Sequence, residues 1–460
     1  MNTLERLAGA AGIVFGSTNC GGFGPEGDRC LRWLAASDAM RPDLAAIRVW
    51  PRRLAPAILA LSSIASGACR EPALKHPTFF IRDSAGIQIL ESAAPAWTDQ
   101  EVWRVDPNPL VDLSEGEDPQ LFRVTSPRQL PDGRIAVFAG GSCEVRIYDG
   151  ERLVRALGRC GEGPGEFGTY ASLSYWPGHG LLVNESPVRV TVIDAQGTIQ
   201  RTAAIIGGRE LPLPYLNGVL SDGILVLSGL RDPGARARSG VDTARLTLGL
   251  SPGLGDTMRV IGTYDGPVYR YEEFRGRIGR SVLPFSSATE IAAGGDRVFV
   301  AFPAQNEIRV LRQDGSVERI LRRPIVANQV TQADIDWLMD RRLAEVEGSD
   351  SKRLVRQAFR HLQYANQMPS FGVPRWTSGL EAGGPVMLED RKGNLWVFDY
   401  YRPGSYRSKF SVFSPEGVWL GGVDLPDGFR PSEIGGDFLL GVWTDDIGFR
   451  HVLKLRLVKP

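Results

Sequence analysis

Short stretches in which hydrophobic and polar residues alternate recur along the chain, and each follows a tight turn that contains Gly or Asp. The first copy, Pro131–Phe138, is followed by a second apolar stretch, Val145–Gly150. Gly and Asp favour the positive φ that tight turns need, and alternating β-branched and aromatic side chains favour strands with one buried face. The pattern therefore predicts antiparallel strands joined by short turns.

Six copies of this turn-plus-strand unit occur along the chain. Their turns lie at positions 133, 180, 223, 296, 393 and 436, so consecutive copies are 47, 43, 73, 97 and 43 residues apart. A spacing of about 40–50 residues is typical of propeller blades, and the two longer steps predict insertions. One small sheet cannot bury both of its faces, whereas radial stacking of several sheets buries them. The chain is therefore predicted to be all-β, with a six-bladed β-propeller over residues 84–460.

The hydrophobic period changes between the fourth and fifth copies, over about residues 331–366. Thr331 and Asp334 have the spacing of a capping box, and apolar residues then recur at helical intervals as far as Gly348, where the first helix is expected to end. A second helical pattern follows. We expect a helical hairpin inserted between blades four and five and packed on one face of the disc. A solvated polar face explains its basic residues better than a binding site does. These residues are Arg341, Arg342, Lys352, Arg353, Arg356 and Arg360.

The segment Gly86–Leu90 predicts a further strand ahead of the first complete copy. The sixth copy, in contrast, has fewer predicted strands than a blade needs. An N-terminal strand added to the last blade accounts for both observations, because it removes an open sheet edge. We therefore expect the propeller to close through this strand.

The residues ahead of the propeller have the order of an export signal. Four arginines precede an apolar stretch, three small residues and a cysteine: Arg41, Arg48, Arg52, Arg53, residues 54–65, residues 66–68 and Cys69. This order predicts a signal peptide over residues 40–69, and its short apolar stretch cannot span a bilayer. The small residues before Cys69 resemble a bacterial lipobox, in which the Cys is lipidated, although Ser66 stands where Leu is usual. Ordinary cleavage near Cys69 is the alternative.

A signal peptide begins a chain, whereas 39 residues precede Met40. We therefore predict that translation starts at Met40 and that residues 1–39 are a leader outside the working protein; a genuine long leader is the alternative. Residues 70–83 are expected to form a linker. The mature protein is then predicted on the periplasmic or cell-surface side of a membrane, anchored through Cys69.

The charge balance limits the classes of partner that the chain is expected to bind, and the cysteines indicate how they pair. The chain has 53 basic and 53 acidic residues, so no overall field attracts nucleic acid and we predict no such partner. Cys143 and Cys160 flank a predicted hairpin that brings them opposite each other, which makes a disulfide geometrically reasonable in an exported protein. Two unrelated thiols are the alternative. Metal binding by these cysteines has little support, because no spaced Cys/His set accompanies them.

Gly158–Phe167 is the most specific local phrase in the chain. It contains a literal GxGxxG, but no helix pattern follows it, and a dinucleotide site needs a helix N-terminus. The phrase resembles the inter-blade segment of NHL-type propellers, in which glycines form the crossing and the Phe packs between blades. The chain is similar to the bacterial six-bladed β-propeller family related to NHL repeats, and Gly436–Trp443 fits the C-terminal pattern of that family. The resemblance implies the fold and an exported, frequently lipid-anchored setting, with no defined activity.

Catalytic motifs are missing from the sequence, so we name no catalytic residue and no cofactor. The four histidines, His76, His179, His361 and His451, lie without an HExxH or GxSxG motif and are expected on the surface or in packing. Asp390–Trp396 approaches the Asp-box of sialidases but has one residue too many, and a blade turn with a core Trp explains it.

Aromatic and charged residues cluster in two predicted loops, and Tyr and Arg are typical anchors of interfaces. We consider a binding rim there, with aromatic cover of the core as the alternative. Its candidates are Tyr269, Arg270, Tyr271, Tyr400, Tyr401 and Arg402.

Two functional hypotheses remain. The first is an exported, membrane-tethered, non-catalytic propeller that binds a protein, peptide or glycan on one disc face. The second, by fold analogy alone, is a hydrolase or lyase of the gluconolactonase type, with a divalent metal held by oxygen ligands in the central channel. Asn184 and Glu185 are candidates for such ligands.

Overall fold

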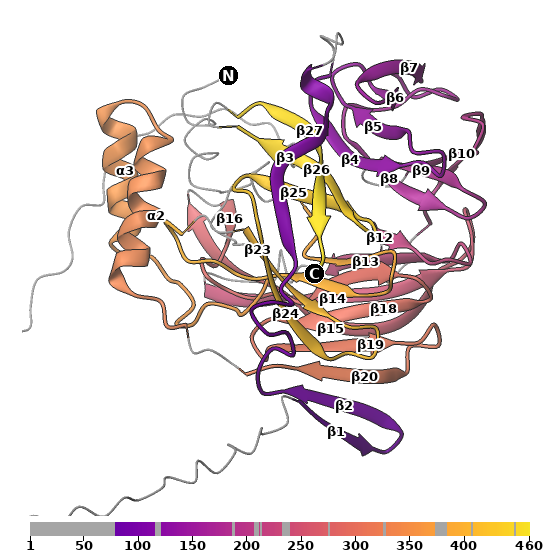
Figure 1. The fold of residues 1–460 in the computed structure, drawn as a ribbon. Coiled ribbons are helices and arrows are strands. Elements are labelled where there is room, and N and C mark those ends of the chain that lie inside the picture. The colour runs from indigo at the N-terminus through magenta and orange to yellow at the C-terminus, as the bar shows by residue number, and fades with distance from the viewer. Residues whose placement is uncertain are drawn as a thin grey trace, which may run out of the picture. The chain divides into compact units, whose positions relative to one another are not determined.

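The computed structural model describes residues 79–460 except for the stretches 116–120, 186–188, 207–210, 212–213, 232–239, 275–276, 325–327, 373–383, 406–407 and 446–447. The predicted leader, the signal peptide with Cys69 and most of the predicted linker lie outside the described residues. Among the described residues the fold is all-β, as predicted, with helices α2 and α3 between strands β20 and β21 (Figure 1).

The described strands form six sheets, which we number 1 to 6, and all their strand pairs are antiparallel except the pair of β2 with β20. Sheet 1 contains β4 (Val124–Gln129), β5 (Ile135–Ala139), β6 (Glu144–Asp149) and β7 (Arg152–Leu157). Sheet 2 contains β8 (Ala171–Trp176), β9 (Gly180–Glu185), β10 (Arg189–Ile193) and β11 (Ile199–Ala204). Sheet 3 contains β12 (Tyr215–Val219), β13 (Leu225–Arg231), β14 (Gly240–Ser251), β15 (Arg259–Phe274) and β16 (Arg277–Val282).

The remaining sheets combine distant parts of the chain. Sheet 4 contains β17 (Glu290–Gly294), β18 (Arg297–Phe302), β19 (Glu307–Leu311) and β20 (Val317–Arg322), extended by β2 (Ile87–Ser92) and β1 (Phe79–Ser84). Sheet 5 contains β21 (Met387–Glu389), β22 (Leu395–Phe398), β23 (Ser408–Phe413) and β24 (Trp419–Leu425). Sheet 6 contains β25 (Phe429–Ile434), β26 (Phe438–Thr444), β27 (Arg450–Val458) and β3 (Arg104–Asp112).

The first strands of the sheets contact one another in a closed cycle. β4 contacts β8, β8 contacts β12, β12 contacts β17, β17 contacts β21, β21 contacts β25, and β25 contacts β4. Because neighbouring sheets meet through their first strands, these strands surround a common axis. This is the arrangement of a β-propeller.

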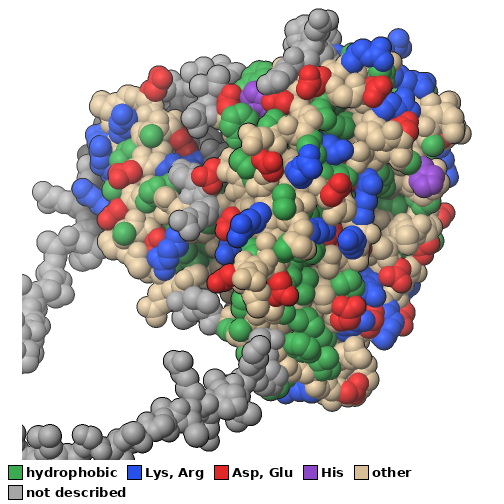
Figure 2. Space-filling model, viewed as in Figure 1, with side chains coloured by type: hydrophobic (Ala, Val, Ile, Leu, Met, Phe, Trp, Pro, Cys, Tyr) green, Lys and Arg blue, Asp and Glu red, His purple; other side chains and the backbone are tan. Residues whose placement is uncertain are grey.

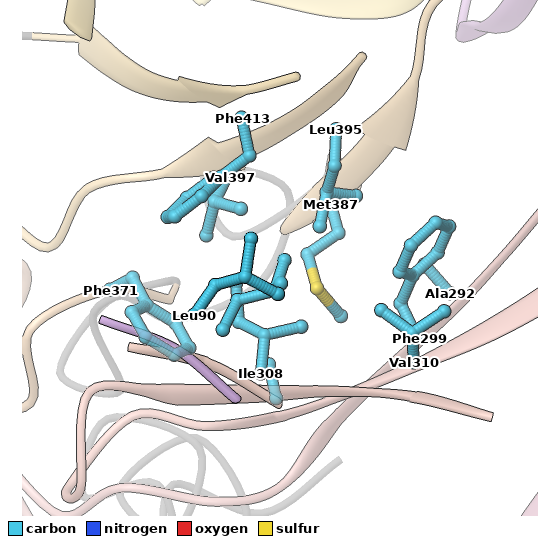
Figure 3. Packing of buried hydrophobic residues seen from close by; sticks show 12 residues of the cluster. Leu90, Ala292, Phe299, Ile308, Val310, Phe371, Met387, Leu395, Val397 and Phe413 are labelled. Atoms are coloured by element: carbon cyan, nitrogen blue, oxygen red, sulfur yellow. The ribbon is translucent and has the colours of Figure 1, made fainter. Parts of the chain in front are cut away.

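The hydrophobic core consists of layers between successive sheets. Phe138 of sheet 1 and Leu173 of sheet 2 share one cluster, and another cluster joins sheet 6 to sheet 1 through Leu440 and Val137. Figure 3 shows the layer between sheets 4 and 5, where side chains of both sheets interdigitate. Each sheet therefore buries its two faces against its neighbours, as the repeat argument requires.

The turns predicted from the repeat lie where the repeat placed them. Each joins the first to the second strand of a different sheet. In three of these turns, glycines Gly133, Gly223 and Gly393 have φ of +93°, +90° and +82° and donate their N–H groups to the carbonyl three residues earlier. In the turn at Asp390, this carboxylate accepts hydrogen bonds from the backbone N–H of Asn394 (2.9 Å) and the indole of the buried Trp396 (3.2 Å). The near-Asp-box segment is therefore a structural turn.

The N-terminal strands correct two expectations. Sheet 6 does gain an N-terminal strand, but the strand is β3, which pairs antiparallel with β27. The predicted strand Gly86–Leu90 corresponds to β2, which instead joins sheet 4 by pairing parallel with β20. β1 also begins inside the stretch 70–83 that we expected to be linker. The hydrophobic Leu90 explains the choice of sheet, since it is buried among residues of sheets 4 and 5 (Figure 3).

The helical pair consists of α2 (Gln332–Ala344) and α3 (Ser349–Phe359). The predicted capping box is confirmed: the Thr331 N–H and hydroxyl both donate to the Asp334 carboxylate, at 2.8 and 2.7 Å. α2 ends at Ala344, and Gly348 precedes α3 rather than terminating α2. The helices cover Phe285 and Met368, with Ile335 and Leu338 of α2 buried in the same cluster.

Candidate functional site

Three exposed aromatic side chains lie at the starts of neighbouring first strands. Phe122 precedes β4, Tyr170 precedes β8, and Tyr215 begins β12. Their exposed fractions are 52%, 66% and 53%. Because β4 contacts β8 and β8 contacts β12, these residues form one edge of the mouth of the ring of first strands. We call Phe122, Arg123, Tyr170 and Tyr215 the aromatic rim.

Arg123 connects two members of the aromatic rim. Its guanidinium carbon lies 5.6 Å from the ring centre of Phe122 and 6.0 Å from that of Tyr170. Cation–π attraction at such distances contributes about 0.5–1 kcal/mol at an exposed site. One cation therefore holds aromatic rings of two sheets beside each other while its hydrogen-bond donors stay near solvent.

The backbone below the aromatic rim is held in an unusual conformation. Arg123 has φ of +55° although it is not glycine. The N–H groups of Gly140 and Gly141 donate to the carbonyls of Arg123 (3.2 Å) and Phe122 (3.1 Å). A Cβ on Gly140 would lie 2.4 Å from the Thr169 carbonyl oxygen, so only glycine fits there. Non-glycine residues in this φ region cost free energy and gather at functional sites.

The first predicted rim lies on a long strand and is only partly exposed. Tyr269, Arg270 and Tyr271 belong to β15, where Tyr271 is only 2% exposed. Burial lowers the pKa of Arg270 below its usual value. The ring of Tyr269 contacts Tyr271 at 6.3 Å, and the Arg280 guanidinium lies 5.0 Å from the Tyr269 ring. These residues stabilise the long strands of sheet 3.

The second predicted rim supports the helices. Tyr400 and Tyr401 pack against the cluster under α2 and α3. Arg402 pairs with the Asp334 carboxylate at 2.9 Å and donates to the Gln329 carbonyl at 2.8 Å. Both clusters pack partly against the core, and a binding role for them stays a prediction.

A polar cluster occupies the opposite end of the first strands. Arg391 pairs with Glu433 at 2.6 Å, and the Tyr175 hydroxyl donates to the Gln129 carbonyl at 2.8 Å. Arg128 donates to the Ser432 carbonyl at 2.8 Å. Burial, followed by the charge of Glu433, raises the pKa of Tyr175, and burial lowers the pKa of Arg128. These groups satisfy one another across sheets 1, 2, 5 and 6, which favours a structural role.

One histidine belongs to a hydrogen-bonded row. His451 Nδ1 lies 2.7 Å from the Ser114 hydroxyl, and Nε2 lies 3.4 Å from the Asp445 carboxylate. The same residue types form nucleophilic triads. Here, however, the Ser114 hydroxyl also lies 2.6 Å from Asp112 and its N–H donates to the same carboxylate at 2.9 Å. A serine bound in this way caps the turn after β3, as expected for a packing histidine.

The candidate metal ligands lie on β9, the second strand of sheet 2. Asn184 and Glu185 are part of β9, and Glu185 is 5% exposed. Both carboxylate oxygens of Glu185 accept hydrogen bonds from Arg189, at 2.7 Å each, and one also accepts the Gly168 N–H at 2.6 Å. These contacts occupy most of the acceptor sites of the carboxylate, and Arg189 neutralises the charge that would attract a metal ion. Within the described part of the chain, no three His, Cys, Asp or Glu residues are grouped as a metal site.

The cysteines and the Gly158–Phe167 phrase form one unit. Cys143 and Cys160 are joined by a disulfide. Phe167 is fully buried in the cluster between sheets 1 and 2 and meets Phe138 edge-on at 6.1 Å. No helix follows the GxGxxG, since the next element is strand β8. The phrase therefore makes the crossing between two sheets and offers no dinucleotide site.

The sequence carries a weak signal for the aromatic rim. Phe122, Tyr170 and Tyr215 stand 8 to 11 residues before the turns of the first three copies. An aromatic residue at one structural position of successive repeats becomes visible only after the repeats are aligned on their strands.

No protein-family model matches the chain, and no curated protein matches it. Solved structures with low sequence identity do match. A protein of Bacteroides fragilis described as exported is 10% identical, with a TM-score of 0.43, over 81% of this chain and 99% of the other. A DUF4221 family member from Bacteroides vulgatus is 10% identical, with a TM-score of 0.43, over 79% and 100%. Virginiamycin B lyase from Staphylococcus aureus is 10% identical, with a TM-score of 0.36, over 78% of this chain and 100% of the lyase.

In the described residues, neither helix has the length and apolar content needed to cross a bilayer.

Proposed function

We propose that the protein is an exported, membrane-tethered β-propeller of six blades that binds a protein, peptide or glycan at the aromatic rim without catalysing a reaction. The blades are the six sheets, and α2 and α3 are an insertion between the fourth and fifth. The cyclic contacts of the first strands and the core layers between successive sheets support this blade count.

Export and tethering rest on the residues before the propeller and on the disulfide. The signal-like order before Cys69 supports processing at that residue. The bond between Cys143 and Cys160 supports an oxidising compartment, because such bonds are rare in reducing ones. Mass spectrometry of the mature N-terminus tests both points. A diacylated Cys69 supports the anchor, an unmodified terminus nearby leaves a soluble exported protein, and a cytosolic chain that still carries residues 1–39 contradicts export.

The aromatic rim is the observation that carries the binding function. Tyr and Arg are enriched among the residues that dominate binding energy, and aromatic rings lose little conformational entropy when they are covered. Here the rings are exposed, Gly140 and Gly141 fix the backbone of Phe122 and Arg123, and Arg123 holds two of the rings together. A pre-organised patch of this kind fits a protein or peptide partner best, with a glycan as the second ligand class.

The binding proposal is tested with the mature protein and rim variants. Ligands recovered from a cell-envelope fraction and from glycan arrays are purified, and their dissociation constants are measured. The double variant Phe122→Ala, Tyr170→Ala is expected to weaken binding at least tenfold, the loss typical of central interface anchors. The control variant Leu230→Ala, Val241→Ala removes apolar side chains that are also exposed but lie on β13 and β14. Equal binding by wild type and the rim variant contradicts the proposal.

Turnover would contradict the non-catalytic part of the proposal. The purified protein is assayed with lactones, esters and sugar derivatives and is treated with a fluorophosphonate. Activity abolished by one carboxylate substitution, or covalent labelling of Ser114, would replace binding with a hydrolase or lyase function. Elemental analysis of protein purified without chelator tests the gluconolactonase alternative, which the engaged Glu185 does not favour.

A further inference from the structure

The hairpin β1–β2 is firmly attached through one strand only. β2 pairs with β20, and its Leu90 is 2% exposed within the core layer between sheets 4 and 5 (Figure 3). Ile89 and Ser92 are buried as well, at 9% and 3% exposed. β1 pairs only with β2 and is the last strand of its sheet. The fold therefore holds β1 in a fixed place at the outer edge of sheet 4.

β1 exposes every one of its residues, although three of them in succession are large and apolar. Phe79, Phe80 and Ile81 are 36%, 55% and 60% exposed. In Figure 2, hydrophobic side chains gather at the lower end of the view, where the hairpin lies in Figure 1. Solvent-exposed aromatic residues in a row at a sheet edge are unfavourable unless something covers them.

The alternation of the strand restricts what can cover these side chains. Successive residues of a strand point to opposite faces, so Phe80 and Ile81 cannot both lie against one flat protein surface. A fluid apolar phase can surround both. The outer backbone N–H and C=O groups of β1 still need water, which limits immersion to the interfacial region of a bilayer, about 5–10 Å deep.

Charge on the hairpin agrees with a shallow position at a bilayer. Arg82 pairs with Glu91 at 2.8 Å, and Arg322 of β20 pairs with the same carboxylate at 3.1 Å. With Asp83 of β1, the two arginines and the two carboxylates balance, so little net charge remains beside the apolar residues. Contact with lipid should therefore depend on apolar burial more than on anionic headgroups.

The distance to the expected anchor is short. Nine residues, 70–78, separate Cys69 from Phe79. Such a segment spans at most about 3.3–3.6 Å per residue, roughly 30 Å in all. A lipid on Cys69 would keep β1 within that distance of the bilayer surface.

We propose that the edge of β1, with Phe79, Phe80 and Ile81, docks into the interfacial layer of the membrane that carries the protein. The inference rests on the proposed tether at Cys69. Docking would add a second contact to the lipid anchor and would fix which side of the propeller faces away from the membrane.

Vesicle binding of the processed chain tests the inference. A Cys69→Ser variant removes lipidation, and its co-sedimentation with vesicles of phosphatidylethanolamine and phosphatidylglycerol is measured. Phe80→Ser and Ile81→Ser are each expected to lower partitioning about tenfold, as partly immersed side chains return to water. Phe80→Leu and Ile81→Leu should retain most of it. A Phe80→Trp variant should show blue-shifted emission and quenching by brominated lipids.

The controls separate this inference from the tether and from other partners. The variant Leu153→Ser, Val154→Ser removes exposed apolar residues from β7 and should bind vesicles like its parent, with circular dichroism confirming the fold. Absence of vesicle binding by the Cys69→Ser protein overturns docking even if wild-type Cys69 is acylated. If the wild type binds vesicles through β1 but Cys69 is not acylated, the docking inference stands and the proposed lipid anchor is wrong. A β1-dependent dimer without vesicle binding identifies a second copy as the occupant and overturns the inference.

Discussion

Gly158 shows how tightly single positions are constrained at the crossing between sheets 1 and 2. Its φ is +97°, and a Cβ there would lie 2.4 Å from the Phe167 ring. A larger residue would have to adopt an unfavourable backbone conformation and would push the Phe167 ring out of place. Glycine is required here for two independent reasons.

We predict that Gly158→Ala lowers the free energy of unfolding by about 2–4 kcal/mol, from backbone strain and overpacking together. Urea unfolding of the purified propeller measures the loss. Gly150→Ala is the matched control, because Gly150 has φ of +58° and no atom lies within 4 Å of the added Cβ. Its cost should be only about 1–2 kcal/mol. Equal losses in the two variants would show that the Phe167 contact is unimportant.

Glu389 is predicted to make stability depend on pH. Burial raises the pKa of its carboxyl above the usual value of 4.5. The charged form is therefore less favourable in the folded state than in the unfolded chain. The resulting penalty is absent below the usual pKa, where both states are protonated, and is complete above the raised folded pKa.

Glu389→Gln should consequently stabilise the protein near neutral pH and have a diminishing effect as the pH falls toward 4. Denaturant unfolding at several pH values measures this trend. Glu416→Gln provides the opposite case, because a hydrogen bond from Ser414 lowers the pKa of Glu416. Its contribution should be present at neutral pH and lost as the pH falls through the lowered pKa. A pH-independent effect of Glu389→Gln would contradict the assignment.

At the scale of elements, the disulfide between Cys143 and Cys160 ties the two ends of the β6–β7 hairpin. The two cysteines are 17 residues apart, and Cys143 is buried in the core layer between sheets 1 and 2. Closing a loop of this length restricts the unfolded chain by about 3 kcal/mol in the chain-entropy view.

Cys143→Ala with Cys160→Ala should therefore lower the free energy of unfolding by about 2–4 kcal/mol. Thermal or urea unfolding with and without dithiothreitol measures it: reductant should destabilise the wild type and leave the double variant unchanged. An equal response of the two proteins to reductant would mean that the bond contributes nothing.

The elements also show what the sequence determines by itself. The six turns were predictable because Gly and Asp have a local conformational role at each of them. β3 was not, because Pro107 and Pro109 make Arg104–Asp112 look like a loop. An outer strand tolerates proline, and Pro109 is accommodated opposite Leu455. Its place in sheet 6 depends on the distant β27, which no local pattern encodes.

The sequence did not reveal the aromatic rim for a similar reason. Tyr271 and Tyr401 lie in Tyr/Arg-rich segments, yet composition does not say whether a ring points into the core or into water. Phe122 and Tyr170 stand 48 residues apart in the sequence and become neighbours only when sheets 1 and 2 pack side by side. A site formed where sheets pack side by side becomes visible only in the three-dimensional fold.

At the scale of the whole molecule, the pairing of β3 with β27 joins the two ends of the propeller. Val111 lies opposite Lys454 in this pairing. A cross-link at this point would close nearly the whole propeller into one loop, and the stabilisation by a disulfide grows with loop length.

We predict that the disulfide formed by Val111→Cys and Lys454→Cys raises the free energy of unfolding by more than about 3 kcal/mol. Urea unfolding under oxidising and reducing conditions measures the gain. The matched pair Ser84→Cys with Ile87→Cys spans only the β1–β2 turn and should give a much smaller gain. If the short cross-link stabilises as strongly as the long one, closure through sheet 6 does not limit unfolding.

The same closure sets an order of events during biogenesis. β3 leaves the ribosome early, whereas its partner β27 emerges after all the other described strands. Until then one side of β3 has no strand to pair with, and sheets 1 and 6 cannot bury the faces they share. A chain that stalls or is truncated before β27 therefore keeps an open edge that invites aggregation or proteolysis. Pairing of β27 with β3 therefore acts as a check on the chain, because a closed ring resists proteolysis better than a product that ends before this strand.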